Sequence, residues 1–205
     1  MRSKKNIFGS GTMRCGGSLH CNLISAHKDI IIATDNLHFF RHIYNKYNPI
    51  KKKSNLYKLS AELSLRLKVR SDLFIDKNKF FNSLLKSYPK NYSSVHETIL
   101  NVFLKEIGNK KIIGEYANGE FAQIKTFLQS NRKNIAYQVF RDPRAVLMSW
   151  KKITFSKGFK YLNAIFNWID AVDHALRNKK KFGNKRFLIL KFEETHSNPK
   201  KVAKK

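Results

Sequence analysis

Cysteine, acidic residues and long apolar runs are scarce in this chain. The two cysteines, Cys15 and Cys21, lie six positions apart among 205 residues, an arrangement that suits neither a disulfide framework nor a zinc site. No apolar stretch approaches the roughly 20 residues that span a bilayer. Residues 1–8 are basic and lead into a glycine turn instead of an apolar h-region, so we expect no signal peptide and a cytoplasmic location.

The scarcity of acidic residues leaves a strong positive charge. The chain carries 41 Lys and Arg against 14 Asp and Glu, which gives a formal net charge of +27. Such a charge attracts polyanions such as nucleic acids, acidic glycans and anionic membrane surfaces. The lysines are spread along the chain, as in 51–53, 179–181 and 200–201, which is typical of solvated faces. We therefore favour a compositional bias and expect no stable nucleic-acid partner.

A glycine-rich turn lies close to the start of the chain, in residues 11–18 (Gly-Thr-Met-Arg-Cys-Gly-Gly-Ser). It follows the apolar residues 6–8 and precedes the segment 19–24, an order that predicts a strand, a turn and a helix. In such a turn, backbone N–H groups and the positive end of the helix converge on an anionic group. The turn therefore predicts a phosphate-binding loop.

The turn departs from the P-loop of nucleoside triphosphatases at one position. Gly11, Gly16 and Ser18 fit the spacing Gly, four residues, Gly, Lys, Ser or Thr, but Gly17 takes the place of the lysine. That lysine would reach the β- and γ-phosphates, so its absence argues against ATP or GTP chemistry. A cation, Arg14, lies inside the turn instead, which is compatible with a ligand that has a single phosphate at this point.

A second candidate anion site follows the apolar run 136–140, which suits a buried parallel strand. Asp142 is a natural N-cap and Pro143 a natural first residue of the helix that follows. Arg141 then lies at the carboxyl end of the strand, where open α/β sheets bind ligands. Ser149 lies about two helical turns beyond the cap. Arg141 and Ser149 are therefore candidates to hold a second phosphate.

These motifs resemble those of the sulfotransferases that use 3′-phosphoadenosine 5′-phosphosulfate (PAPS). Residues 14–19 (Arg-Cys-Gly-Gly-Ser-Leu) are similar to the family's Arg-Ser-Gly-Thr-Thr-Leu loop, which binds the 5′-phosphosulfate end. Residues 141–149 are similar to its Arg-Asp-Pro-Arg…Ser motif, whose first Arg and Ser hold the 3′-phosphate. Residues 186–194 resemble a strand that ends in Tyr-Glu-Asp, and Asn198-Pro199 resembles the helix start that follows it.

The resemblance implies PAPS as the donor substrate and no metal. The residues that it assigns to the donor are Arg14, Cys15, Gly16, Gly17, Ser18, Leu19, Arg141 and Ser149. Arg14 is also a catalytic candidate, because with the loop amides it can stabilise the charge that grows on the leaving 5′-phosphate. Cys15 and Gly17 replace a serine and a threonine of the family's loop, so side-chain hydroxyl contacts to phosphate are lost there, while Ser18 keeps one.

The other catalytic candidate is Glu115. In this region relatives often carry Gly-Glu-Lys-Thr, and this chain keeps the Glu but has Tyr116 in place of the Lys. We expect Glu115 to end a strand over 111–115, to project at the cofactor edge of the sheet and to act as the base for the acceptor. An ordinary loop carboxylate is an equal alternative, and His20 and His27 are weaker candidates.

The order of the elements predicts the fold class. We expect four strands, at about 5–8, 111–115, 135–140 and 186–192. Because helices separate them, they predict a three-layer α/β/α fold with a central parallel sheet. The resemblance implies that this is the P-loop-NTPase-like fold of the sulfotransferases.

Length and composition predict a single domain. At 205 residues and 42% hydrophobic, the chain can bury one substantial core, and we expect residues 1–205 to form one domain. Residues 45–110 are expected to be helical and to shape the acceptor side. The chain stops at Lys205, before the C-terminal segment that helps to cover the nucleotide in relatives, which indicates a truncated or short member.

Two helices have clear signatures in the sequence. Ser94 and Glu97 form a capping box that predicts a helix start at Ser94. An apolar stripe at helical spacing predicts that one face of a later helix lies in the core. The stripe consists of Leu162, Ile165, Phe166, Ile169, Val172 and Leu176.

The resemblance implies a sulfotransferase that moves the sulfuryl group of PAPS to a hydroxyl or amine of a small-molecule or glycan acceptor, with a saccharide slightly favoured. Three alternatives stay open. A P-loop-like nucleotide kinase predicts Mg²⁺-dependent ATP binding, and a basic nucleic-acid-binding protein predicts steeply salt-dependent binding. A degenerate member of the family binds the nucleotide without reacting. The oligomeric state is not determined by the sequence.

Overall fold

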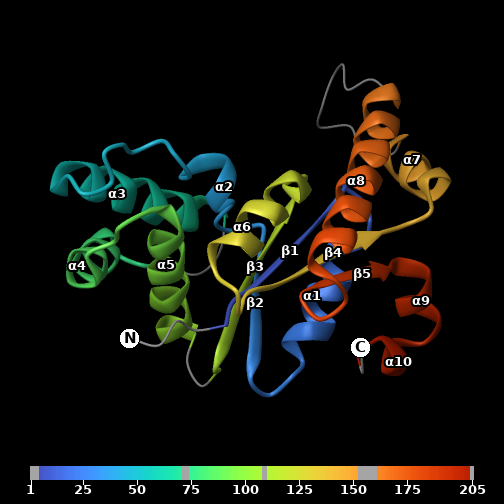
Figure 1. Ribbon diagram of the computed structural model, residues 1–205, viewed down its shortest axis with the longest axis horizontal. Coiled ribbons are helices and arrows are strands. Elements are labelled where there is room, and N and C mark those ends of the chain that lie inside the picture. Colours follow the sequence, from blue (N-terminus) through green and yellow to red (C-terminus); the bar gives the residue numbers. More distant parts are fainter. Residues whose placement is uncertain (1–4, 71–73, 108–109, 152–160, 204–205) are drawn as a thin grey trace.

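The computed structural model describes residues 5–70, 74–107, 110–151 and 161–203 (Figure 1). Its centre is a five-stranded sheet in which every neighbouring pair is parallel, in the order β2-β3-β1-β4-β5. The strands are β1 (Ile7–Gly11), β2 (Ile30–Thr34), β3 (Ile112–Asn118), β4 (Ile135–Phe140) and β5 (Phe187–Lys191). Helices cover both faces, so the fold is the three-layer α/β/α fold that the sequence predicted.

The edge strand β2 was not among the four strands that we expected from the sequence. Its signal is the run Ile30-Ile31-Ile32, since three consecutive β-branched residues favour a strand. In the structure Ile30 pairs with Ile112 of β3, and Thr34 pairs with Tyr116. The carboxyl ends of β2 and β3 therefore lie side by side.

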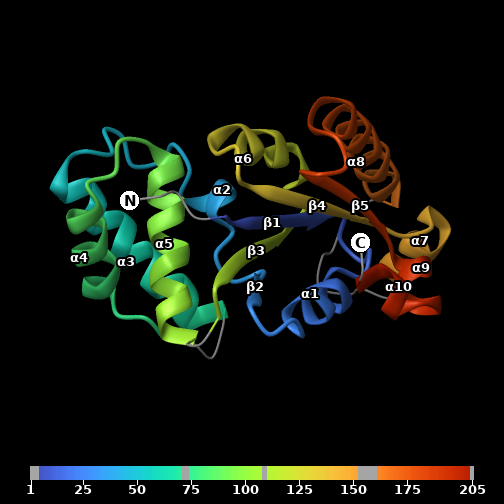
Figure 2. The ribbon, with the colours of Figure 1, turned by 60° about the horizontal axis from the view of Figure 1, so that its bottom comes forward.

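The helices form one layer on each face of the sheet (Figure 2). One layer contains α1 (Gly17–Ser25), α9 (Phe192–Ser197) and α10 (Pro199–Ala203), and the other contains η1 (Phe121–Gln123), α6 (Ile124–Ser130) and α8 (Tyr161–Phe182). Alternate residues of β1 divide between them: Ile7 packs with Cys21 and Val202, whereas Phe8 packs with Phe127 and Ala171. Each face of the buried strand thus contributes to a separate core.

The segment from 45 to 110 contains α3 (Lys53–Arg70), α4 (Lys77–Ser87) and α5 (Tyr92–Ile107), and the short α2 (Phe39–His42) precedes it. These helices share a third apolar core with Ala33 of β2 and Ile113 of β3. The helices therefore pack directly on the sheet edge formed by β2 and β3, and they extend the molecule on that side (Figure 1).

Helix α5 begins two residues earlier than the expected Ser94. Its cap is Asn91, whose side-chain Oδ1 accepts a hydrogen bond of 3.0 Å from the Ser94 amide, while the Asn91 amide donates to Ser94 Oγ at 3.2 Å. A capping box is therefore present, but it joins Asn91 and Ser94 instead of Ser94 and Glu97. The sequence-based assignment was wrong because Asn is as good an N-cap as Ser.

The expected core stripe of α8 is wrong in part. Phe166, Ile169 and Leu176 are more than half exposed, and the side facing the sheet holds the small residues Ala164, Ala171 and Ala175. Close packing explains this, because Gln138 of β4 donates its amide to the carbonyl of Ala171 at 2.8 Å and brings the helix backbone near the strand. The side chain of Leu162 lies outside those described.

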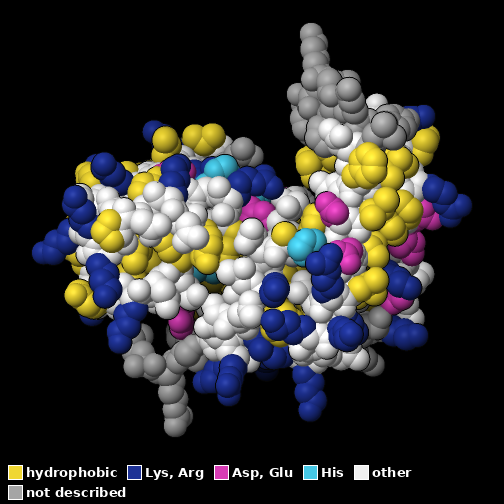
Figure 3. All heavy atoms as spheres, turned by 45° about the horizontal axis from the view of Figure 1, so that its top comes forward, with side chains coloured by type: hydrophobic (Ala, Val, Ile, Leu, Met, Phe, Trp, Pro, Cys, Tyr) yellow, Lys and Arg dark blue, Asp and Glu magenta, His cyan; other side chains and the backbone are white. Residues whose placement is uncertain are grey.

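The outward apolar side chains of α8 lie on the face shown in Figure 3. Together with the ends of β4 and β5, this helix borders an open pocket of about 370 Å³, lined by residues that include Trp168, Leu176 and Ile189. Although α8 is the longest helix described, neither it nor any other helix in the described ranges is long and apolar enough to cross a membrane.

Candidate functional site

The glycine-rich turn connects β1 to α1 as predicted, at the carboxyl edge of the sheet. Arg14 has φ 69° and Gly16 has φ 91°, so the chain twice enters the left-handed region between strand and helix. No side chain caps α1, and the first-turn N–H groups of a helix have no partners within it. Such amides and the positive end of the helix dipole favour an anion at the start of a helix.

The two glycines that follow Cys15 allow close contact with two aromatic rings. A Cβ atom on Gly16 would lie 2.2 Å from Cδ2 of Phe192, and one on Gly17 would lie 2.2 Å from the hydroxyl oxygen of Tyr116. Two of the positions at which this chain differs from the family's motifs, Gly17 and Tyr116, are therefore in contact. Tyr116, which replaces a lysine, occupies the volume that a threonine at position 17 would need.

Cys15 lies beneath the surface of the turn. Its side chain is fully buried and lies 3.4 Å from the hydroxyl of Tyr116. Burial raises the pKa of the Cys15 thiol to about 11, so the sulfur stays protonated and is no anion ligand. Ser18 and Leu19 are exposed, and the hydroxyl that the sequence predicted for phosphate binding therefore lies at the surface.

The second motif has the predicted form. Helix α7 (Pro143–Lys151) begins at Pro143, and Oδ1 of Asp142 accepts a hydrogen bond of 2.8 Å from the Arg144 amide. The guanidinium of Arg144 also binds Asp142, and it lowers the pKa of that carboxyl to about 2. Trp168 of α8 donates to the Arg141 carbonyl at 3.1 Å. The cap and the helix above it thus fix the backbone at Arg141.

The two predicted anion motifs meet at the carboxyl edge of the sheet. Nε of Arg14 donates to Oγ of Ser149 at 2.9 Å, and Nη1 of Arg141 lies 3.4 Å from the Arg14 carbonyl that it donates to. The Arg141 guanidinium also lies 4.6 Å from the ring centroid of Phe192, the first residue of α9. The site therefore combines two guanidinium groups, a hydroxyl and the uncapped start of α1.

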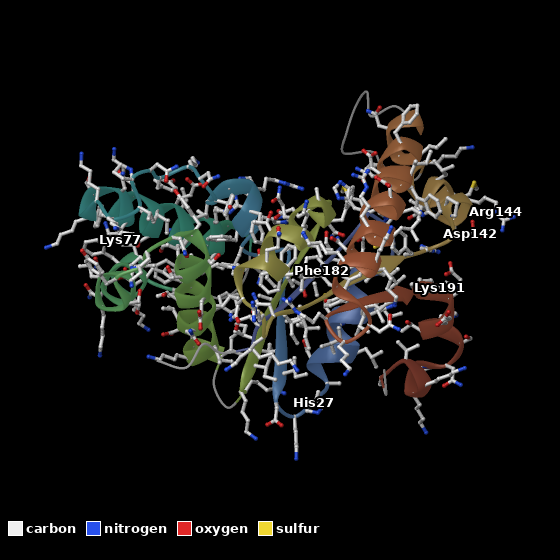
Figure 4. The ribbon with its side chains drawn as sticks, in the orientation of Figure 1. His27, Lys77, Asp142, Arg144, Phe182 and Lys191 are labelled. Atoms are coloured by element: carbon white, nitrogen blue, oxygen red, sulfur yellow. The ribbon has the colours of Figure 1, made fainter. Side chains whose placement is uncertain are left out.

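The predicted histidine candidates do not face this site. Nδ1 of His20 donates to the Gly16 carbonyl at 2.9 Å, and the Thr195 hydroxyl lies 2.8 Å from its Nε2. Burial lowers the pKa of His20. The neutral ring therefore connects the turn to α9 through its two hydrogen bonds. His27 lies in the turn before β2, at the other end of the sheet from Asp142 (Figure 4).

The placement predicted for Glu115 is wrong. β3 continues to Asn118, and Glu115 lies in its middle, fully buried. The buried Tyr116 and Ala117 extend the apolar run, so the strand keeps pairing with β1. One carboxylate oxygen of Glu115 accepts from the Phe39 amide at 3.0 Å, and the other lies 2.9 Å from Nε2 of His96. Glu115 therefore fixes the start of α2 and does not project at the cofactor edge.

A cluster of charged groups that we did not predict lies where β2 and β3 end. His38 has one ring nitrogen 2.7 Å from Oε1 of Glu120 and the other 3.3 Å from Oδ1 of Asp35. Asp35 also accepts from the Asn118 backbone amide at 2.9 Å, and Arg41 donates to the Asn118 carbonyl at 3.0 Å. The sequence holds no motif for it, because the cluster forms only when two strand ends are adjacent.

The His38 ring is held in its charged form. Burial is the largest influence and acts to lower its pKa, but the hydrogen bonds and charges of Asp35 and Glu120 together raise the pKa of His38 to about 9. The pKa of Asp35 is lowered, because its bonds to His38 and Asn118 outweigh the burial that acts to raise it. Within the described ranges, no three or more His, Cys, Asp or Glu side chains gather as a metal site.

A protein-family model described as "Sulfotransferase family" matches residues 6–205. A comparison with curated proteins finds no match.

Solved structures share the fold at low identity. The sulfotransferase domain of the Synechococcus PCC 7002 olefin synthase has a TM-score of 0.57 at 13% identity, over 97% of this chain and 70% of that one. A sulfotransferase from Alicyclobacillus acidocaldarius has a TM-score of 0.53 at 14% identity, over 98% and 78%. The sulfotransferase domain of the curacin biosynthetic pathway has a TM-score of 0.55 at 14% identity, over 98% and 72%.

Proposed function

The chain belongs to the sulfotransferase family, whose model matches residues 6–205, and we propose that it transfers the sulfuryl group of PAPS to a hydroxyl or amine of a small acceptor. The observation that carries the choice of donor is the junction of the two anion motifs. Arg14 donates to the hydroxyl of Ser149, and Arg141 donates to the backbone carbonyl of Arg14. A nucleotide with phosphates at both its 3′ and 5′ positions matches two cationic groups on one edge of the sheet.

The donor would bind with its 5′-phosphosulfate over the start of α1 and its 3′-phosphate between Arg141 and Ser149. The amides of Gly16, Gly17 and Ser18 supply fixed donors without side-chain desolvation, as anion sites at helix starts do. Their fit to an anion is supported by the missing side-chain cap on α1. Cys15 and Leu19 would contribute backbone contacts.

PAPS supplies a sulfuryl group on a phosphate leaving group, and the protein's task is to orient it and stabilise the leaving charge. Arg14 is exposed and lies next to the loop amides, so its guanidinium can move from Ser149 to the 5′-phosphate. A donor aimed at the oxygen where charge grows contributes more in the transition state than in the ground state. The catalytic role of Arg14 is therefore electrostatic.

The role of base predicted for Glu115 stays a prediction that its surroundings do not favour. Both of its oxygens already have partners, and one of them is the backbone amide of Phe39 in α2. A general base must lie within hydrogen-bond reach of the proton that it takes. Direct transfer from an acceptor to Glu115 would require α2 to move.

We place the acceptor beside α2, where β2 and β3 end. The side chains there are polar or charged, with Asp35, Arg41 and Asn118 at the mouth of the cluster. Such groups bind hydroxyls by hydrogen bonds and offer little to an apolar molecule. This composition supports a hydroxylated acceptor such as a saccharide, on the side where the helices of 45–110 pack.

The high positive charge is not needed for this proposal. Lys and Arg side chains are spread over the face shown in Figure 3 and do not gather in one patch. A field of this sign accelerates the arrival of an anionic donor. It does not by itself favour a nucleic acid as the partner.

Calorimetric titration tests the proposal against its rivals. We expect adenosine 3′,5′-bisphosphate, the product that PAPS leaves, to bind more tightly than ATP with Mg²⁺ or an oligonucleotide. Tighter binding of ATP with Mg²⁺ contradicts the proposal in favour of a kinase. A preference for the oligonucleotide, lost steeply with salt, contradicts it in favour of a nucleic-acid-binding protein.

A transfer assay separates an enzyme from a degenerate relative. Radiolabelled PAPS is incubated with simple sugars, amino sugars and phenols, and labelled products are separated by chromatography. We expect a labelled sugar. A protein that binds the bisphosphate but transfers to none of these acceptors, and releases no product from PAPS, is a binding protein and not a sulfotransferase enzyme.

A further inference from the structure

The charged cluster at the ends of β2 and β3 has an unusual backbone. Asp35 has φ 53° and His38 has φ 48°, a left-handed conformation that non-glycine residues seldom adopt. Such conformations persist only where the surroundings fix them, and they gather at functional sites. The contacts of His38 supply that fixing here.

His38 is clamped between two carboxylates from different strands. Nδ1 lies 2.7 Å from Oε1 of Glu120, which follows β3, and Nε2 lies 3.3 Å from Oδ1 of Asp35, which follows β2. A carboxylate oxygen can only accept, so each ring nitrogen carries a proton. The clamp is therefore an imidazolium that joins the two strand ends.

Glu120 has one carboxylate oxygen without a partner. Its side chain is 4% exposed. Oε1 lies 2.7 Å from Nδ1 of His38 and 3.8 Å from Nε of Arg41. Oε2 is buried and has no hydrogen-bond partner among the described residues. A buried carboxylate oxygen left unpaired is costly, and a ligand hydroxyl that donates to it would remove that cost.

The backbone of Glu120 is tied to the strand that leads into the glycine-rich turn. Its amide donates to Oγ of Ser10 at 3.1 Å, and the preceding Gly119 amide donates to the Gly11 carbonyl at 2.8 Å. Ser10 Oγ in turn donates to the Ala117 carbonyl at 2.6 Å. The carboxylate is therefore held at the same edge of the sheet as the turn that contains Arg14.

We propose that Oε2 of Glu120 accepts the proton of the acceptor hydroxyl, and that His38 is the positioning residue that holds this carboxylate. The inference rests on the proposed sulfuryl transfer. The acceptor O–H bond breaks toward Glu120 while its oxygen bonds to sulfur, and the bond from sulfur to the 5′-phosphate oxygen breaks with its electron pair going to the phosphate. The products are the sulfated acceptor and adenosine 3′,5′-bisphosphate, and Glu120 returns its proton to water.

Several charged and titratable groups surround the carboxylate of Glu120. The titratable and charged groups that face the cluster are Asp35 from the turn after β2, Glu120 from the start of η1, Arg41 and His42 from α2, and Glu62 and Arg66 from α3. His38 and Arg41 supply the positive charge nearest to Glu120. Loss of the His38 proton would free one end of the clamp and let the carboxylate turn away.

The test measures the release of adenosine 3′,5′-bisphosphate from PAPS by the full chain, with the acceptor panel and with water alone. We expect Glu120→Gln to lower turnover by about a hundredfold or more, the usual range for a lost general base, while the affinity for adenosine 3′,5′-bisphosphate stays within about twofold. Glu106→Gln on α5 is the matched control, because Glu106 pairs with Lys79 at the surface.

The role of His38 is tested by the pH dependence of turnover, which a purely structural residue would not change. We expect wild-type turnover to fall above about pH 9, where the His38 ring loses its proton, and we expect His38→Asn to be slower at neutral pH and to lack this decline. Asn is chosen because it tolerates the left-handed conformation. A decline of the same size in His38→Asn overturns the positioning role.

The outcomes separate this inference from the proposed function. Wild-type protein that binds adenosine 3′,5′-bisphosphate and turns over PAPS, with Glu120→Gln equal to it, overturns the inference and leaves the proposed function standing. Wild-type protein that does neither overturns both. If Glu120→Gln fails to fold, Glu120→Asp decides: it keeps a carboxylate, and turnover that stays at the wild-type level at every pH contradicts a role that depends on the position of that oxygen.

Discussion

Nε of Arg14 donates a hydrogen bond of 2.9 Å to Oγ of Ser149 across 135 positions of sequence. Arg14 belongs to the turn after β1, and Ser149 belongs to α7 after β4. Because β1 and β4 are paired neighbours in the sheet, their carboxyl ends bring the two residues together. The bond shows that the two anion motifs lie in one site.

Removal of either arginine tests that site directly. We expect Arg14→Ala and Arg141→Ala each to weaken the binding of adenosine 3′,5′-bisphosphate by about tenfold or more, since a charge-assisted hydrogen bond contributes about 1.5–3 kcal/mol. Titration calorimetry measures the affinity, and circular dichroism checks the fold. Arg177→Ala is the control, because Arg177 pairs with Asp173 on α8. Unchanged affinity in both site variants would contradict the assignment.

Gly16 of the turn and Gly183, which follows α8, differ in what surrounds them, and this difference provides a second prediction. Gly16 and Gly183 both have positive φ, 91° and 65°, but a Cβ on Gly16 would meet Phe192 at 2.2 Å whereas one on Gly183 would meet nothing within 4 Å. We expect Gly183→Ala to cost about 1–2 kcal/mol of unfolding free energy from backbone strain alone. Gly16→Ala has the same strain and a clash.

The measurement for this pair is urea unfolding together with titration of adenosine 3′,5′-bisphosphate. Gly16→Ala should be the less stable variant, and it alone should lose affinity, because α9 must move away from the turn. Equal stability of the two variants would show that Phe192 gives way freely, and the contact would then not define the turn.

The inner face of α8 provides a third prediction. Ala171 is fully buried and accepts the Gln138 amide, whereas Phe166 on the outer face is 62% exposed. We expect Ala171→Leu to cost about 1–3 kcal/mol or more, because it overpacks the contact between helix and strand. Phe166→Ser should change stability by about 0.5 kcal/mol or less. Denaturant unfolding of both variants checks this, and the reverse order would restore the predicted core stripe.

The turn and the capped helix proposed to hold the donor could be predicted from the sequence because their parts are local. Gly16, Arg141 and Asp142 each lie at a strand end with a helix directly after it, so the spacing alone indicates a turn and a cap. The same holds for the helix start at Asn198-Pro199, where α10 begins at Pro199. Local patterns of this kind survive folding because they involve few other residues.

The acceptor side could not be predicted in the same way. The positions of Glu115, His38 and Glu120 depend on how far β3 runs and on which strand lies beside it. β2 was missed, so the neighbour that carries Asp35 was missed with it. The exchange of Lys for Tyr116 could be read from the sequence, but its coupling to Gly17 is visible only in space.

The pH dependence of stability provides a fourth prediction. The folded-state pKa of His38 is about 9, above its ordinary value of 6.5, because Asp35 and Glu120 outweigh the opposing effect of burial. A raised pKa means that the clamp's contribution is fully present below about pH 6.5 and is lost as the pH rises through about 9. The contribution is on the order of 3 kcal/mol at its largest, from the linkage between protonation and folding.

Urea unfolding of wild type and His38→Asn at intervals from pH 6 to pH 10 isolates this contribution, since other titrating groups are common to both proteins. We expect the difference in unfolding free energy to be largest at pH 6 and to shrink toward pH 10. A constant difference over that range would mean that the ring is neutral throughout. His38 would then donate one hydrogen bond only, and the ring would not join both carboxylates.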